Sequence, residues 1–184
     1  MPQIIDKSAT TPAAGDYLLS QASGGLTSKV TPVAVRDGGA VYGQLYYSNS
    51  TGTDVNLGTQ NVWYGTKFLV AGAARGVTQD VSDATSDHLT IVTAGTYRIM
   101  FTACADPDAA GTYEIGIHVD GTACSRGGIA IVSPSVSDSI SETGHSLVSL
   151  AAGKEISDRA RCTSAASKVL KFFVISLSAE RIGA

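Results

Sequence analysis

The sequence predicts an all-β protein, a sandwich or barrel that carries an extended arm at its N-terminus. Three observations support this prediction. From residue 41 onward, apolar and polar residues alternate with a period close to two, which is typical of strands. The chain contains 20 Gly together with abundant Ser, Thr and Ala, a composition that favours many turns and few long helices. Turn signals recur every 8–12 residues or so, about the spacing found in sandwiches and barrels.

Length, charge and hydrophobicity limit the classes of function. A chain of 184 residues suits one domain plus an arm, because a fold of this size buries roughly 70% of the surface that its unfolded chain exposes. The formal net charge of −3, without a cluster of Lys and Arg, argues against nucleic-acid binding. No run approaches the ~20 apolar residues of a membrane span, and the N-terminus lacks the pattern of a secretory signal. We therefore expect a soluble, cytosolically synthesised protein without membrane contact.

Residues 1–40 differ in composition from the rest of the chain. Short apolar clusters alternate there with Gly, Ser, Thr and Pro, and no cluster is large enough to close a core. The segment is either a flexible linker or an arm ordered against a partner, and its apolar content favours the arm. We therefore predict an attachment arm, residues 1–40, and a second unit, residues 41–184. The predicted attachment residues are Tyr17, Leu18, Leu19, Val30, Val33 and Val35.

The first predicted strands follow residue 41. "VYGQLYYSN" begins the alternation, and "NVWYGTKFLVAG" continues it less regularly. In "DHLTIVTAGTYRIMFTACA", Leu89 and Ile91 share one face of a strand. Tyr97, Ile99 and Phe101 share one face of the next, so both strands are expected to contribute to the core.

A hairpin is predicted next, in "TYEIGIHVDG". Asp120-Gly121 is a strong signal for a two-residue hairpin turn. "TACSRGGIAIV" forms the returning strand, and "SVSDSISETGHSLVSLAAGKEISDRARCTS" contributes a polar strand, a strand with Leu147 and Leu150, a turn at Gly153 and a further strand. The alternation places Tyr113, Ile115, Ile117 and Val119 inward, and Glu114, Gly116, His118 and Asp120 outward.

The last predicted strand, "KVLKFFVISLSAERI", has apolar residues on both faces. One face can fill the core, and the second needs a cover, because a strand buried on one side only is polar on the other. A neighbouring subunit or the N-terminal arm could provide this cover, and we favour the subunit. The two predicted faces are Val169, Phe173, Ile175 and Leu177, and Leu170, Phe172 and Val174.

No pattern of residues predicts catalysis, a cofactor or a metal. The chain lacks a nucleophile elbow and paired catalytic carboxylates, so we do not expect an enzyme. Asp106 and Asp108 lack the pattern of a calcium loop and are expected to form a turn. The three histidines, His88, His118 and His145, are far apart, and surface or strand-end roles are favoured. A threefold axis could still gather three copies of an outward His118 around a metal.

The cysteines and the aromatic residues each leave an alternative open. Cys104, Cys124 and Cys162 include no C-x-x-C pair and are expected to be reduced, although a Cys104–Cys124 bridge between neighbouring strands is an alternative. The aromatic residues early in the domain are expected in the core or in subunit interfaces, or alternatively to stack on sugars. They are Tyr42, Tyr46, Tyr47, Trp63 and Tyr64.

The order of motifs over residues 41–182 resembles the jelly roll of the tumour-necrosis-factor-like and complement-globular-head-like proteins. In that family a G-x-Y strand, here "GTYRIMFTACA", precedes a strand ending in a D-G or N-G turn, here "GTYEIGIHVDGT". A leucine-rich strand leading into a Gly turn, "HSLVSLAAGKEI", and an aromatic C-terminal strand, "VLKFFVISLSAERI", complete the pattern. The resemblance implies a β-sandwich of about ten antiparallel strands that forms a homotrimer, with the last strand near the threefold axis. Leu170, Phe172 and Val174 are therefore the predicted trimer-interface residues.

The arm provides a second resemblance. "GDYLLSQASGGLTSKVTPVAV" is similar to a phrase in structural proteins of tailed bacteriophages, often near the attachment regions of fibres and head-decorating proteins. It implies a trimeric capsid decoration, cement or head-fibre protein, anchored through its arm to the major capsid protein or a tail protein. We expect it on the capsid surface rather than on the tail. The alternative is a tail-fibre or receptor-binding module for a bacterial surface glycan, using "SNSTGTDVNLG" or "DPDAAG".

Overall fold

The computed structural model describes residues 40–133 and 139–184, and these form strands, turns and loops without a helix. The predicted attachment residues Tyr17, Leu18, Leu19, Val30, Val33 and Val35 lie outside the described residues. No helix in the described part of the chain is long and apolar enough to cross a membrane.

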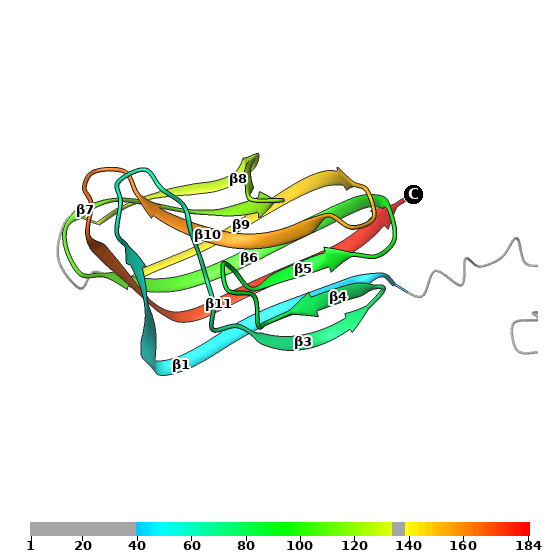
Figure 1. Ribbon diagram of the computed structural model, residues 1–184, viewed down its shortest axis with the longest axis horizontal. Helices are drawn as coiled ribbons and strands as arrows, with labels where there is room; N and C mark the ends of the chain where they lie inside the picture. Colours follow the sequence, from blue (N-terminus) through cyan, green and yellow to red (C-terminus); the bar gives the residue numbers. More distant parts are fainter. Residues whose placement is uncertain (1–39, 134–138) are drawn as a thin grey trace, which may run out of the picture. The chain divides into compact units, whose positions relative to one another are not determined.

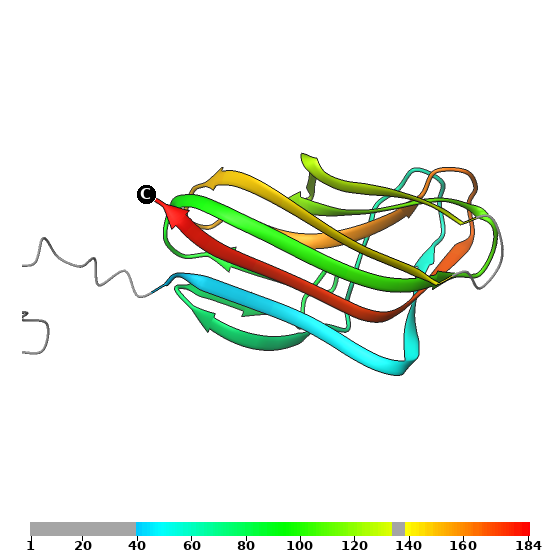
Figure 2. The same ribbon diagram turned by 180° about the vertical axis from the view of Figure 1, so that it is seen from behind.

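The strands form two antiparallel sheets that pack face to face (Figures 1 and 2). Sheet A has the order β3 (Val70–Arg75), β1 (Tyr42–Leu57), β11 (Lys168–Gly183), β6 (Gly95–Pro107), β9 (Ile140–Leu150). Sheet B has the order β4 (Val77–Asp80), β5 (His88–Ile91), β10 (Glu155–Cys162), β7 (Gly111–Val119), β8 (Thr122–Ser133), and β2 (Tyr64–Gly65) also pairs with β10. The predicted all-β jelly-roll sandwich is confirmed.

The chain enters and leaves the described part of the molecule at one end. Tyr42 of β1 lies opposite Glu180 of β11, and the Arg181 amide donates to the Val41 carbonyl at 2.8 Å. Figure 1 shows the start of β1 and the end of β11 together there, and the connections from β6 to β7 and from β10 to β11 at the opposite end. We call these the proximal end and the distal end.

The core lies between the sheets and consists of the residues that the period of two selects. Tyr97, Ile99 and Phe101 of β6 are buried, as are Leu89 and Ile91 of β5, so both predicted faces are confirmed. Their partners from β7 include Tyr113, Ile115 and Ile117, all buried as predicted, whereas Val119 is half-buried. Leu150 also joins the core, but Leu147 is 63% exposed.

The hairpin turn forms as predicted. Asp120 and Gly121 have φ values of 49° and 74°, and positive φ at both central residues defines the turn that matches the twist of a hairpin. The Asp120 carboxylate accepts from the Glu155 amide at 3.0 Å and pairs with Lys154, so the turn is also tied to β10. These contacts lower the pKa of Asp120, the backbone hydrogen bond contributing most.

The predicted faces of the last strand require a correction. Leu170 and Phe172 are fully buried in the core, so their predicted outward placement is wrong. The cause is a β-bulge at Phe173, which leaves one residue unpaired between Phe172 and Val174 and shifts the alternation by one position. Beyond the bulge the inward residues are Ile175, Leu177 and Ala179.

The bulge leaves the inner face of β11 apolar, whereas its outer face is mixed before the bulge, with Val169 and Phe173 beside Lys171, and largely polar beyond it. Lys171, Ser176, Ser178 and Glu180 lie outward, and Val174 remains 38% exposed beside them. Of the three predicted interface residues, only Val174 therefore exposes its side chain on this face.

The cysteines are free thiols, two of them half-buried and Cys162 buried. Cys104 lies on β6 of sheet A and Cys124 on β8 of sheet B, so the alternative of a bridge between neighbouring strands is wrong.

Candidate ligand sites at the distal end

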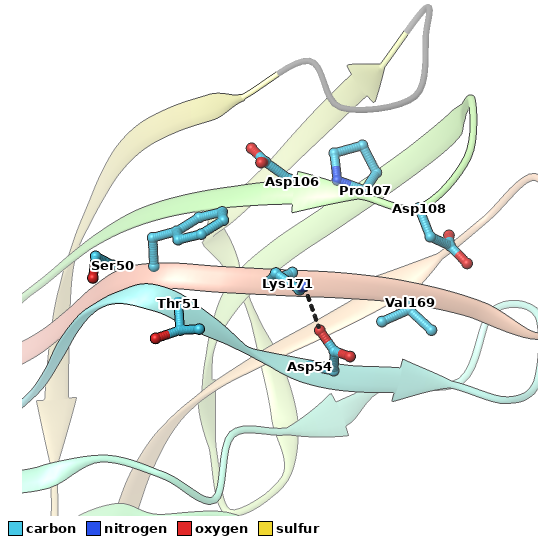
Figure 3. A pocket seen from close by; sticks show the side chains of 9 residues that line it. Ser50, Thr51, Asp54, Asp106, Pro107, Asp108, Val169 and Lys171 are labelled. Carbon is cyan, nitrogen blue, oxygen red and sulfur yellow. Dashed lines mark ion pairs between the residues drawn. The ribbon is translucent and has the colours of Figure 1, made fainter.

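A hollow of about 560 Å³ opens at the distal end, on the outer side of sheet A (Figure 3). It brings together the bend of β1, the end of β6 and the first half of β11, which include parts of the two loops considered for ligand binding in the sequence. We call it the distal hollow. Its lining residues are Ser50, Thr51, Asp54, Asp106, Pro107, Asp108, Val169, Lys171 and Phe173.

A row of alternating charges crosses the distal hollow. Lys171 pairs in register with Asp54 on one side and Asp106 on the other, and its Nζ lies 3.9 Å from the Asp54 Oδ1. Both members of this ion pair are about half exposed, so it contributes less than about 1 kcal/mol. The Asp106 Oδ1 is shielded from solvent and has no hydrogen-bond partner among the described residues.

The acidic residues of this hollow also end β6, as the sequence predicts for a turn. The Tyr113 hydroxyl donates to the Ala109 carbonyl at 2.7 Å, which fixes the bend after Asp108. No cluster of three or more metal-ligating side chains occurs in the described ranges, 40–133 and 139–184.

A second hollow, of about 400 Å³, lies on the other side of the distal half of β1, and Asp54 lines both. We call it the aromatic hollow. It forms where the segment after β1 crosses toward sheet B and reaches the start of β5 and the middle of β10. Its lining residues are Asp54, Val55, Asn56, Trp63, Tyr64, Gly65, Lys67, Phe68, Thr85 and Arg159.

Trp63 is held in this hollow by its contacts with the outer face of sheet B. Its ring meets the ring of His118 edge to face, with centroids 4.5 Å apart and planes at 70°. The Arg161 guanidinium carbon lies 4.5 Å from the Trp63 ring centroid, and Arg161 is itself paired with Glu114 at 2.5 Å. An aromatic ring with a cation on its face and a partner at its edge is a well-fixed element.

His118 lies on the outer face of sheet B, as its predicted outward position requires, but it is buried beneath Trp63 instead of exposed. Its Nδ1 donates to the Gly116 carbonyl at 3.1 Å, and its Nε2 is without a partner among the described residues. Burial lowers its pKa, since desolvation disfavours the charged ring. A buried ring beneath Trp63 does not reach a shared axis, so the alternative of a threefold metal site on His118 is not supported.

The remaining histidines and tyrosines considered in the sequence line neither hollow. His88 is buried with its Nδ1 at 3.1 Å from the Ser86 carbonyl, and His145 is exposed on β9. Tyr42 and Tyr46 are exposed on the outer face of sheet A, whereas Tyr47 packs edge-on against Phe68, with centroids 4.6 Å apart.

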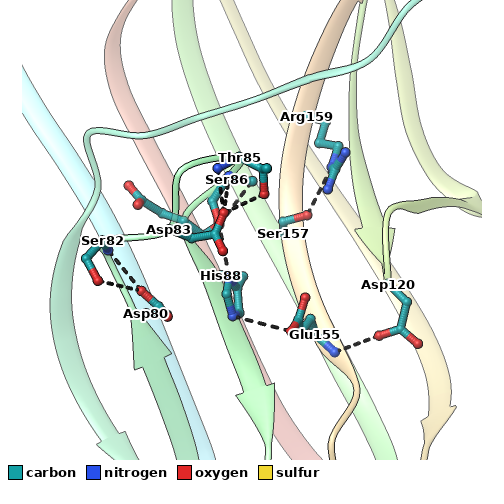
Figure 4. A network of polar contacts seen from close by, with 11 residues as sticks. Asp80, Ser82, Asp83, Thr85, Ser86, His88, Asp120, Glu155, Ser157 and Arg159 are labelled. Atoms are coloured by element: carbon teal, nitrogen blue, oxygen red, sulfur yellow. Dashed lines mark hydrogen bonds and ion pairs between the residues drawn. The ribbon is translucent and has the colours of Figure 1, made fainter.

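A network of polar contacts fixes the turn that precedes β5 (Figure 4). The Asp83 carboxylate accepts from the Thr85 hydroxyl and from the amides of Thr85 and Ser86, the amides at 2.5 and 3.1 Å. The hydroxyl bond, followed by the two amide bonds, lowers the pKa of Asp83 to about 2. The His88 Nε2 lies 3.8 Å from the Glu155 Oε1, which links the start of β5 to β10. This network positions the backbone beside the aromatic hollow.

Two buried carboxyl groups lie behind this turn, and the sequence did not reveal them. Asp158 of β10 is fully buried, and its Oδ1 accepts from the Thr66 hydroxyl at 3.1 Å. The Asp87 Oδ2 accepts from the Leu69 amide at 2.7 Å. Each group keeps one oxygen without a partner among the described residues.

Burial governs the protonation of this pair. Desolvation raises the pKa of Asp158 to about 7, and the nearby negative charge of Asp87 adds to the rise. The pKa of Asp87 is raised as well, again chiefly by burial. The burial of Asp158 could have been found in the sequence, because this residue shares the inward face of its strand with Ile156 and Ala160.

Solved structures with this arrangement of sheets define the class of fold, and 170 chains match, so the assignment does not depend on one neighbour. Eiger, a TNF protein of S. frugiperda, matches with a TM-score of 0.57 and 11% identity over 78% of this chain and 93% of that chain. The globular domain of zebrafish complement 1qA matches with a TM-score of 0.50 and 10% identity, over 75% and 94%. Murine APRIL matches with a TM-score of 0.50 and 11% identity, over 77% and 99%.

These likenesses show the TNF- and C1q-like jelly roll, the fold that the motifs implied. At 10–11% identity they show the fold alone. No family model and no curated protein matches the sequence.

Proposed function

We propose that this chain is a non-enzymatic structural protein of a tailed-bacteriophage virion, a homotrimeric capsid decoration, cement or head-fibre protein. In this proposal residues 41–184 form the trimer, and residues 1–40 attach it to the major capsid protein or a tail protein. Attachment then depends on avidity, because three tethered arms bind one particle together.

The outer face of sheet A is the observation that supports assembly. Six of the ten large apolar side chains exposed by the described residues lie there, so a partner gains most apolar burial by covering this face. They are Tyr42, Tyr46, Val70, Met100, Leu147 and Val174. The jelly-roll fold adds support, since the family resemblance implies a trimer.

Light scattering coupled to size exclusion tests the assembly. We expect three times 18.8 kDa for the wild type and the monomer mass for the double variant Met100→Glu, Leu147→Glu, which places two carboxylates on the face. Val92→Glu is the matched control, because Val92 is 55% exposed in the turn after β5 and should leave the mass unchanged. A monomeric wild type would end the trimer proposal.

Truncation tests the attachment. Deleting residues 2–36 should leave a folded trimer that no longer joins particles lacking the full-length protein. Incorporation of the truncated protein at the wild-type level would show that residues 1–40 are not the anchor.

A second candidate function is a receptor-binding module for a bacterial surface glycan. The distal hollow favours it, because parts of both loops considered in the sequence meet there, at the end opposite to residue 40. A glycan array with the purified protein, together with host adsorption of particles lacking it, provides the test. Silence on the array with unimpaired adsorption would contradict this function.

A further inference from the structure

The aromatic hollow combines flat apolar surfaces with cations that have no anionic partner. Trp63, Tyr64 and Phe68 supply the aromatic surfaces, and Lys67 and Arg159 the cations. Among the described residues neither cation lies within ion-pair distance of a carboxylate, and the Arg159 Nε makes only a long contact of 3.4 Å to the Ser157 hydroxyl. The guanidinium itself lies beside Gly121 of the hairpin turn, and most of its donors make no hydrogen bond among the described residues.

The fold brings these groups together. Arg159 of β10 pairs in register with Gly65 of β2, and Tyr64 and Trp63 directly precede this glycine. The Tyr64 hydroxyl accepts from the Thr59 amide at 2.9 Å, and Trp63 is clamped by His118 and Arg161. Because both rings are fixed before a ligand arrives, binding orders few side chains.

The chemistry of the lining selects one class of ligand. Aromatic rings pack against the apolar faces of sugar rings, and guanidinium and ammonium groups bind carboxylates by charge-assisted hydrogen bonds. On the β1 side, Asp54 and Asn56 offer acceptors for hydroxyl groups. A neutral sugar leaves both cations unused, and a simple inorganic anion leaves the aromatic surfaces unused.

We propose that the aromatic hollow binds a carboxylate-bearing sugar unit of an acidic polysaccharide, with Arg159 and Lys67 on the carboxylate and Trp63 and Tyr64 against the ring. This inference rests on the second candidate function, since it names the class of glycan. It places the recognition in the aromatic hollow rather than in the distal hollow.

Fluorescence titration tests it directly, because Trp63 is the only tryptophan in the chain and lines the hollow. The probe is trigalacturonate, and its methyl ester is the neutral control of the same shape. We expect a saturable change with trigalacturonate and at least about tenfold weaker binding of the ester, the effect of losing a charge-assisted pair. Comparable affinity for the ester, or no saturable change at millimolar trigalacturonate, would overturn the inference.

Substitutions locate the site. Arg159→Gln and Lys67→Gln should each weaken binding about tenfold, and Arg75→Gln, at the exposed end of β3 and outside both hollows, should not. Lys67 is exposed, so its variant keeps the test valid if Arg159→Gln fails to fold. Unchanged binding by folded Lys67→Gln and Arg159→Gln would refute the assignment.

Failure of this inference is distinguishable from failure of the receptor function. If the protein binds neutral glycans on an array and Phe173→Ala in the distal hollow abolishes that binding, the receptor function stands and the acidic-sugar assignment is wrong. If sodium phosphate binds as tightly as trigalacturonate, the aromatic residues play no part, and the assignment is equally wrong.

Discussion

Asp158 makes the stability of this domain dependent on pH in an unusual direction. Its carboxyl group lies in the core with a single hydrogen bond, from Thr66, and burial raises its pKa to about 7. Asp158→Asn replaces the carboxyl with a neutral group of nearly the same shape that still accepts from Thr66. The variant therefore removes the ionisation and leaves the packing almost unchanged.

The direction of this pH dependence follows from which state, folded or unfolded, holds the proton on Asp158. Between pH 4 and 7 or so, the folded state holds a proton on Asp158 that the unfolded state releases, because the unfolded pKa is about 3.8. The free energy of unfolding contributed by this group is fully present below pH 4 or so and is lost as the pH rises through about 7. A rise from 3.8 to about 7 corresponds to about 4 kcal/mol between the two protonation states.

Urea unfolding of the wild type and Asp158→Asn at pH 4.5, 6 and 8, at one protein concentration, measures this effect. We expect similar free energies of unfolding at pH 4.5 and a variant more stable than the wild type by up to about 4 kcal/mol at pH 8. Comparing the two proteins at each pH removes the titrations that they share. If Asp158→Asn is equally or less stable at pH 8, the carboxyl group is not kept neutral by its surroundings and the reasoning fails.

Two further predictions concern the outer covering of sheet B and the bulge of β11. Trp63→Ala should expose His118 and raise its pKa toward the ordinary value, which an NMR titration of the ring protons measures; an unchanged pKa would show that Trp63 does not cause the desolvation. Phe172→Ala should lower the free energy of unfolding by about 3–5 kcal/mol and Val174→Ala by less than about 1.5, because only Phe172 fills the core. Equal effects in denaturant unfolding would contradict the register shift at the bulge.

The strands could be predicted because their pattern is local. Tyr97, Ile99 and Phe101 stand at every second position, so the period of two assigned them to one face without knowledge of the partner strands, although Met100 between them is itself apolar. The Asp120-Gly121 turn was equally accessible, because positive φ at two successive residues favours these residue types. In both cases the information lies within a few positions of the chain.

The bulge and the hollows could not be predicted in this way. A single unpaired residue at Phe173 exchanges the inward and outward positions of β11, and the alternation around an apolar "KFFVI" fits either register. The aromatic hollow assembles Asn56, Trp63 and Arg159 from separate segments, and only the pairing of β2 with β10 places them together. Asp158 shows the complementary case, in which the alternation was visible but a carboxyl group at an inward position was not expected.

Assembly and ligand binding make different demands on the two hollows. The charge row of Asp54, Lys171 and Asp106 lies on the outer face of sheet A, the face proposed to contact neighbouring subunits. Trimer formation would thus change the access to the distal hollow, whereas Trp63 and Arg159 belong to the sheet B side. We therefore expect the monomeric double variant at positions 100 and 147 to bind trigalacturonate as the wild type does. Loss of binding in that variant would instead place a second subunit in the aromatic hollow.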